Sequence, residues 1–190
     1  MATPQKIRCT VESILDHGGH VYTVGLSPDQ TLPRFKAGQF LHLALDPYDP
    51  SEYWPESRVF SIASSPSERE KLLITYSVKG VYTSRMESEL SIGHEVWIKM
   101  PYGEFIIDCT HPVVLIAGGT GMTAFTAFLD NLSEADTCPV AVFYGARRTN
   151  LLIFRAFLEE KQKTCLNLKV WYYAEELDNP AENEIKGQLS

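Results

Sequence analysis

The sequence lacks closely spaced cysteines, a surplus of basic residues and any apolar run long enough to span a membrane. Its four cysteines, Cys9, Cys109, Cys138 and Cys165, are scattered, and the nearest two are 27 positions apart. Zinc and iron–sulfur ligands usually recur at short, regular cysteine spacings, so we expect no metal site. We expect four free thiols, buried or partly buried, as in a reducing compartment such as the cytoplasm.

Basic residues are also too few for a nucleic-acid partner. The chain has 17 Lys and Arg against 24 Asp and Glu, a formal net charge of −7. Binding to nucleic acid or to anionic lipid would favour a basic excess or cluster. The start of the chain has no apolar core of a signal peptide, which again favours the cytoplasm. The charge-free run 113–129 contains four residues of a Gly-rich turn, which predicts a strand, loop and helix rather than a membrane span.

The first half of the chain is typical of antiparallel β-structure. Short alternating or β-rich runs are separated by turn residues, a pattern that predicts a small, closed or nearly closed barrel. The six predicted strands are Lys6–Ile14, His20–Leu26, Phe40–Leu45, Arg58–Ile62, Leu72–Val78 and Glu95–Met100. Ser84 and Glu87 have the spacing of a capping box and predict a helix that runs from Ser84 towards Ser91.

After Asp108 the pattern changes to strands alternating with helices. Val113–Ala117 and Val140–Tyr144 are continuous apolar runs, typical of parallel strands buried on both faces, and Leu168–Tyr173 is a third strand. A helix through Asn131 and another over Leu151–Lys163 join them into a βαβαβ unit. We therefore predict an antiparallel barrel over residues 1–108 and a Rossmann-like α/β domain over residues 109–190. Three strands leave an edge that further βα units would cover, so we expect this second domain to be truncated or continued beyond Ser190.

A glycine motif lies between the first apolar strand and its helix. Gly119-Thr120-Gly121-Met122-Thr123-Ala124 fits G-x-G-x-x-G/A, in the context expected of a dinucleotide-binding turn. The glycines allow close backbone approach, and the helix N-terminus offers N–H groups to a pyrophosphate. The alternative is a glycine turn that holds no ligand.

Two arginines follow the second apolar strand. Arg147 and Arg148 stand where an acidic residue would bind the ribose of NADH, whereas arginine would accommodate the phosphate of NADPH. The pair favours NADPH over NADH, and the alternative is a solvated basic loop.

Five short motifs, in order, resemble the ferredoxin–NADP reductase superfamily, in particular bacterial flavin reductases and oxygenase reductase modules. They cover nearly the whole chain: Arg58-Val59-Phe60-Ser61, Tyr76-Ser77-Val78-Lys79-Gly80-Val81-Tyr82-Thr83, Pro101-Tyr102-Gly103-Glu104-Phe105, Gly118-Gly119-Thr120-Gly121-Met122-Thr123 and Phe143-Tyr144-Gly145-Ala146-Arg147. The resemblance implies a flavin-binding barrel followed by a nicotinamide-nucleotide domain.

The resemblance also implies roles for individual residues. Arg58 is similar to the arginine that pairs with flavin phosphate, and Phe60 takes the place of the family's more usual tyrosine against the flavin ring. Ser61 resembles the residue beside the flavin atom that receives hydride, and Thr120 lies where the nicotinamide approaches, so these two are the catalytic candidates. The other implied cofactor-binding residues are Val59, Tyr76, Val78, Lys79, Gly80, Tyr82, Thr83, Gly118, Gly119, Gly121, Met122, Arg147 and Arg148.

The implied function is that of a flavin-dependent NAD(P)H oxidoreductase. Its cofactors would be FAD, in preference to FMN or free flavin, and NADPH or NADH. The implied electron acceptor is a ferredoxin-like protein, an oxygenase component or a free flavin. The alternative is a non-catalytic flavin-binding electron-transfer or docking subunit of a larger complex.

Overall fold

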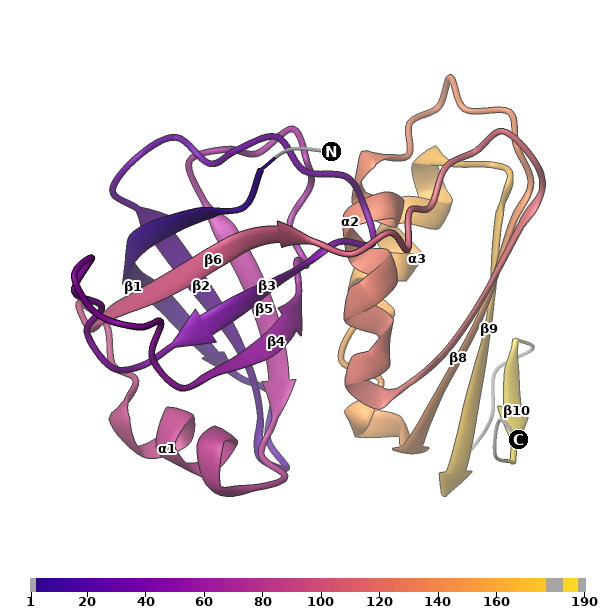
Figure 1. Cartoon of the computed structure of the whole chain (residues 1–190). Helices are drawn as coiled ribbons and strands as arrows, with labels where there is room; N and C mark the ends of the chain where they lie inside the picture. Colours follow the sequence, from indigo (N-terminus) through magenta and orange to yellow (C-terminus); the bar gives the residue numbers. More distant parts are fainter. Residues whose placement is uncertain (1–2, 177–182, 188–190) are drawn as a thin grey trace.

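A computed structural model of the chain describes residues 3–176 and 183–187 and contains two sheets packed through helices (Figure 1). Strands of the first half form one antiparallel sheet in the order β4-β3-β6-β1-β2-β5. Their bounds are β1 Gln5–Asp16, β2 Val21–Pro28, β3 Phe40–Ala44, β4 Ser57–Ser61, β5 Leu72–Ser77 and β6 Glu95–Tyr102. The Ala63 N–H, just after β4, donates to the Leu73 carbonyl of β5 at 2.8 Å. This bond brings the two end strands together, and the predicted nearly closed barrel is confirmed.

The barrel core follows from the two-residue period of its strands. In β1, Ile7, Cys9 and Val11 point inward and are almost completely buried, while their neighbours face solvent. Equivalent positions of the other strands complete one apolar cluster that also includes Met86 of the helix α1 (Val81–Glu89). The barrel is therefore a filled core, and a ligand can bind only on its surface.

Helix α1 begins earlier than its sequence pattern suggests. The predicted start at Ser84 is wrong, because the helix begins at Val81 with Gly80 as its N-cap. Thr83 closes the first turn, since its Oγ1 accepts the backbone N–H groups of Lys79 and Gly80 at 2.9 and 3.1 Å. The Thr83 hydroxyl therefore caps the start of the helix, in place of the capping box predicted at Ser84 and Glu87.

The second half forms a parallel sheet in the order β10-β9-β8-β7. Its elements are β7 Val113–Gly118, the 3-10 turn η1 Gly119–Met122, α2 Thr123–Asn131, β8 Val140–Arg148, η2 Thr149–Leu151, α3 Arg155–Thr164, β9 Leu168–Glu176 and β10 Glu184–Lys186. The predicted Rossmann-like unit is confirmed, with two corrections. A fourth strand, β10, is too short to show a period, and the second helix begins at Arg155 because η2 precedes it.

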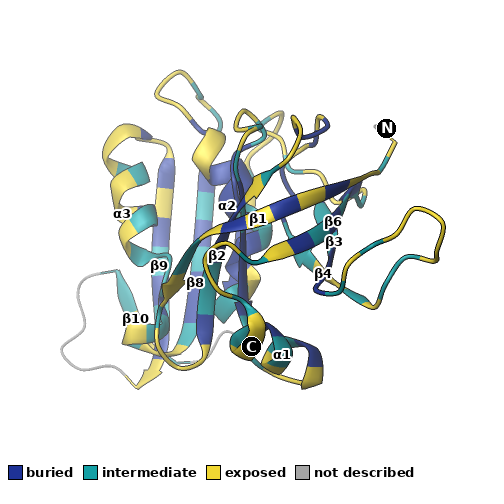
Figure 2. Ribbon diagram, turned by 90° about the vertical axis from the view of Figure 1, so that its left-hand side faces the viewer, coloured by how far each residue is buried: buried dark blue, intermediate teal, exposed yellow. Residues whose placement is uncertain are grey.

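Only one face of the parallel sheet is covered by the described residues. Helices α2 and α3 both lie on the side of this sheet that faces the barrel (Figure 1). Figure 2 shows buried positions alternating with more exposed ones along β8 and β9. Val114 and Ile116 on the other face are 62% and 63% exposed, beside the stacked rings of Phe143 and Trp171. The prediction that the apolar run of β7 is buried on both faces is therefore wrong for the described residues. An apolar strand is buried on both faces only where other elements cover each face, and the described residues cover one.

The expectation of four free thiols is also wrong. Cys109 and Cys138 form a disulfide, with their Cα atoms 5.6 Å apart, while Cys9 and Cys165 are free and buried. The two joined cysteines precede β7 and β8, which are neighbouring strands, so residues distant in sequence meet at one end of the sheet. Within the described residues, no helix has the length and apolar character needed to cross a bilayer.

Candidate functional site

A cleft of about 780 Å³ lies where the barrel meets the carboxyl ends of the parallel strands. In open α/β sheets, this edge is the usual place for a bound ligand. The barrel contributes the end of β5 and the β1–β2 turn, and the second half contributes the η1 turn and the ends of its strands. The lining residues of this central cleft are Gly19, Val21, Ser77, Val78, Lys79, Gly118, Gly119, Thr120, Gly121, Gly145, Ala146, Arg147, Leu151, Ile153, Glu175 and Gly187.

The predicted glycine turn faces the central cleft with bare backbone. A Cβ atom built on Gly118, Gly119 or Gly121 would meet no other atom within 4 Å, so each glycine borders open space. Gly119 has φ of +52°, a conformation that disfavours other residues. The turn therefore permits close approach of a ligand to the backbone N–H groups that precede α2. Met122, by contrast, is buried in the core of the second half and lies outside the cleft lining.

Two hydroxyl groups meet across the central cleft. Ser77 Oγ, at the end of β5, lies 3.5 Å from Thr120 Oγ1 of the η1 turn. The two halves are also joined behind this point, where Thr126 Oγ1 of α2 donates to the Ala63 carbonyl at 3.0 Å. The walls of the cleft are therefore held together by contacts between the barrel and the second half.

The predicted ring-binding residues separate into two groups. Phe60 and Ser61, at the end of β4, are partly buried, and Val59 is exposed on this edge strand. Tyr76 instead points into the barrel, where its ring lies edge-on to Phe60 at 6.2 Å, and burial raises its pKa. Tyr76 thus supports Phe60 from behind. Alternation along β5 turns the next residue, Ser77, towards the cleft, so the expected orientation of Tyr76 needs correction.

Arg58 lies beside the N-terminal end of α1. Its guanidinium sits 4.9 Å from the ring centre of Tyr82, donates to the Ser57 carbonyl at 3.0 Å and pairs with Glu56 at 2.9 Å. About half of the Arg58 side chain is exposed. The cation is therefore oriented by its neighbours and still accessible to an anion.

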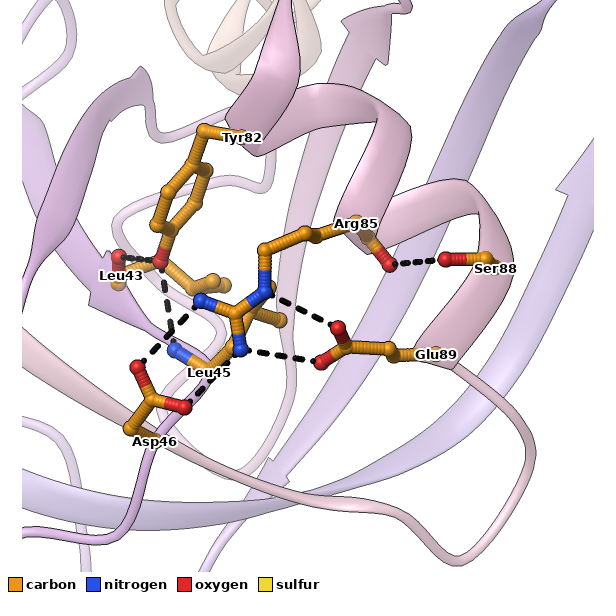
Figure 3. Close-up of polar contacts among 7 residues, drawn as sticks. All are labelled: Leu43, Leu45, Asp46, Tyr82, Arg85, Ser88 and Glu89. Carbon is orange, nitrogen blue, oxygen red and sulfur yellow. Dashed lines mark hydrogen bonds and ion pairs between the residues drawn. The ribbon is translucent and has the colours of Figure 1, made fainter.

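Two side chains fix α1 against the barrel (Figure 3). The hydroxyl of Tyr82 donates to the Leu43 carbonyl at 2.6 Å and accepts the Leu45 N–H at 3.2 Å; burial raises the Tyr82 pKa to about 12. Arg85 pairs with both Asp46 and Glu89, and its hydrogen bonds lower the pKa of Asp46. The helix N-terminus is thereby held in a defined position relative to Arg58.

A second hollow runs along α1 and joins the central cleft. Its volume is about 890 Å³, and its lining includes Gly80, Val81 and Ser84 at the start of the helix. Val78 and Lys79 line both this hollow and the central cleft. A Cβ on Gly80 would meet nothing within 4 Å. The two hollows are therefore continuous through Val78 and Lys79, from the start of α1 to the glycine turn.

The two arginines expected to select the nucleotide have different surroundings. Both lie at the end of strand β8, where Arg147 lines the central cleft and Arg148 pairs with Glu176 of β9 at 3.1 Å. Glu175, also on β9, lines the cleft together with Arg147. The loop itself contains no acid, but strand pairing brings carboxylates beside the two arginines from a later segment.

Comparisons with known proteins agree with this geometry. Residues 115–188 match the family described as oxidoreductase NAD-binding domain. The NAD(P)H-flavin reductase of Aliivibrio fischeri is 33% identical over 80% of this chain and 66% of its own length. The reductase component of propane 2-monooxygenase from Mycolicibacterium smegmatis is 26% identical over 98% of this chain and 53% of its own length.

The chain belongs to the ferredoxin–NADP reductase superfamily. Solved structures agree in fold: the Amycolatopsis cytochrome P450 reductase GcoB superposes with a TM-score of 0.82 at 23% identity, over 95% of this chain and 55% of that one. The FAD/NAD-binding domain of the Vibrio cholerae nitric oxide dioxygenase superposes with a TM-score of 0.81 at 18% identity, over 97% of this chain and 79% of that one. The chain spans about half to two-thirds of the length of the two curated relatives named above.

Sequence reasoning missed several residues of this superfamily member's cleft. Ser77 lies inside one of the five motifs, but the motif does not reveal that Ser77 faces the cleft while Tyr76 faces the barrel core. Glu175 carries no motif of its own, and its position at the end of a β-strand after the second helix is the one signal that could have found it. Gly19 and Gly187 come from segments remote in sequence, which only the folded chain brings together.

Proposed function

We propose that this chain is the flavin- and nucleotide-binding module of an NAD(P)H oxidoreductase, passing reducing equivalents from NAD(P)H through FAD to an acceptor. The observation that carries the proposal is the pair of joined hollows that run from the start of α1, where Arg58 contacts the Tyr82 ring, to the glycine turn. One end offers a cation and a helix N-terminus, and the other offers bare backbone before a second helix. Both ends suit phosphate groups.

The barrel side fits FAD. Arg58 presents a planar fork that suits a phosphate, and the first N–H groups of α1 have no intrahelical partners because of their place in the helix. Phe60 would present a ring face and Ser61 a hydroxyl to the isoalloxazine, with the backbone of Val78 and Lys79 beside them. Tyr82 and Thr83 act indirectly, since they fix the helix and the turn at its start.

The second half fits a nicotinamide dinucleotide, and its charges favour NADH over NADPH. Gly118, Gly119 and Gly121 leave room for the pyrophosphate. The Glu175 carboxylate can accept hydrogen bonds from a ribose diol and would repel a phosphate in its place. Arg148 is already paired with Glu176, so Arg147 is the arginine of the cleft lining that could bind the extra phosphate of NADPH.

Bound flavin supplies the redox chemistry: it accepts hydride from NAD(P)H and passes the electrons on. The contribution of the chain is positioning. Ser77 and Thr120 border the place where the two halves meet, so their hydroxyls can orient the polar edges of both ring systems. Neither residue needs to act as an acid or base, because hydride transfer moves no proton from the protein.

The remaining assignments complete this proposal. The chain divides into two domains near residue 108, since the barrel strands end at Tyr102 and the parallel strands begin at Val113. The acceptor is a ferredoxin-like protein, an oxygenase component or free flavin, as the oxygenase reductase components and flavin reductases among the relatives suggest. We place the protein in the cytoplasm.

An anaerobic titration tests the proposal. The protein is reconstituted with FAD and titrated with NADH, then in a separate sample with NADPH, while the visible flavin absorbance is followed. We expect bleaching at lower concentrations of NADH than of NADPH. Flavin that binds but stays oxidised with both nucleotides would refute hydride transfer within this chain and favour the docking-subunit alternative. A protein that retains no flavin would refute both.

A further inference from the structure

Two partly buried cysteines hold the end of the parallel sheet that lies away from the central cleft. Cys109 precedes β7 and Cys138 precedes β8, and they are joined across 29 positions with a Cα separation of 5.6 Å. The strands begin side by side, since Val113 pairs with Val140 and the Val113 N–H donates to the Pro139 carbonyl at 2.9 Å. The disulfide thus joins two strands where their pairing starts.

The ring closed by this disulfide contains much of the nucleotide site. Between the two cysteines lie β7, the glycine turn and α2. Cys109 also belongs to the segment that connects the barrel to the parallel sheet, and this segment bonds to the barrel through the Gly103 carbonyl, which accepts from Gln39 at 2.9 Å, and through the Ile107 N–H, which donates to the Ala37 carbonyl at 3.4 Å. Opening the disulfide would therefore loosen the first βα unit, which begins at the end of this connecting segment.

The other two cysteines are poorly placed to compete in thiol chemistry. Cys9 is 1% exposed in the barrel core, and burial raises its pKa to about 12, so its reactive thiolate is almost absent at neutral pH. Cys165 is 6% exposed in the core of the second half. Cys109 and Cys138, in contrast, are only partly buried against that core, so they are less shielded from a small thiol or disulfide than the other two.

We propose that Cys109 and Cys138 form a reversible redox clasp that sets the stability of the nucleotide-binding half. A low-molecular-weight disulfide oxidises the pair: the two thiols lose two electrons and two protons, one protein S–S bond forms, and the small disulfide is reduced to two thiols. A low-molecular-weight dithiol reverses the step and is itself oxidised to a disulfide. In a reducing compartment such pairs are typically transient and redox-sensing, so an oxidised clasp would report a change in thiol–disulfide balance.

Mass spectrometry of the whole folded chain tests the bond. Oxidised glutathione or dithiothreitol is applied without denaturant, free thiols are alkylated, and the protein is digested with trypsin. Both cysteines fall in one tryptic peptide, residues 100–147, whereas Cys9 and Cys165 fall in others. We expect this peptide to be unalkylated and two hydrogen atoms lighter after oxidation, and doubly alkylated after reduction. Thiols that stay alkylatable after oxidation would overturn the proposal, as would a bond that opens only in denaturant.

Thermal unfolding tests the consequence. Reduction of wild-type protein should lower Tm by about 10 °C, from the loop-closure entropy of a ring of this length in a chain of this size. Cys109→Ser and Cys138→Ser should unfold at the lower temperature and no longer respond to dithiothreitol. Cys165→Ala is the matched control: it loses a buried thiol, keeps the clasp and should keep the response. Equal Tm values for the oxidised and reduced wild-type protein would overturn the proposal without any variant. None of these measurements depends on flavin or nucleotide binding, so their outcome is separate from that of the proposed function.

Discussion

Replacing Arg58 with alanine should weaken flavin binding strongly while leaving the fold nearly unchanged. The guanidinium is accessible, and its own contacts are an exposed ion pair with Glu56, a bond to the Ser57 carbonyl and the face of the Tyr82 ring. An exposed ion pair contributes at most about 1 kcal/mol, and an exposed cation–π contact is of similar size. Loss of the side chain should therefore lower the free energy of unfolding by only about 1 kcal/mol.

The loss of a phosphate contact is larger. A hydrogen bond to a charged group contributes about 1.5–3 kcal/mol, so the dissociation constant of FAD should rise roughly 10- to 150-fold. Arg58→Lys should fall between wild type and Arg58→Ala, because lysine keeps the charge and loses the fork. Glu56→Gln should strengthen binding slightly, since it frees the guanidinium from a competing carboxylate.

Fluorescence titration of the apoprotein with FAD measures these constants directly. Arg8→Ala is the matched control, because Arg8 of strand β1 is about equally exposed and pairs with Asp29 after β2 and Glu95 of β6. Its affinity for FAD should equal that of wild type. If Arg58→Ala binds FAD within twofold of wild type while remaining folded, Arg58 does not contact the phosphate and the assigned cofactor orientation is wrong.

Two further predictions concern charge. Glu175→Gln should raise the ratio of kcat/KM for NADPH to kcat/KM for NADH by about 10-fold. Arg147→Ala should lower this ratio, and Arg148→Ala should change it less. An effect of Arg148→Ala larger than that of Arg147→Ala would contradict the assignment of Arg147 as the cleft-lining arginine. His20 Nδ1 lies 2.7 Å from Glu87 Oε1, and this bond raises the pKa of His20 and lowers that of Glu87. The pair should therefore stabilise the protein when His20 is protonated, below its ordinary pKa, and lose that contribution as pH rises through the raised value. NMR titration should show the His20 pKa above 6.5 in wild type and lower in Glu87→Gln; identical values in both proteins would disprove the coupling.

Local patterns determined most of the secondary structure. All six barrel strands were predictable because a half-buried strand alternates every two residues, and β1 shows that alternation clearly with Ile7, Cys9 and Val11. The strand–glycine turn–helix unit was equally predictable, since its apolar run and its glycines are contiguous in sequence. Boundaries were less so: α1 begins at Val81 because a threonine at its third position closes the turn, an arrangement that the capping-box pattern further along concealed.

By itself, the sequence determined the order of the two folding patterns and the glycine turn, because each depends on residues that are neighbours in the chain. Only the tertiary structure decided which groups share an environment. Pairing of β8 with β9 brings Glu176 to Arg148 and Glu175 to the cleft of Arg147, and pairing of β7 with β8 brings Cys109 to Cys138. It also decided that one face of the parallel sheet is uncovered among the described residues. These are contacts between distant segments, and their energies depend on three-dimensional packing that no local pattern encodes.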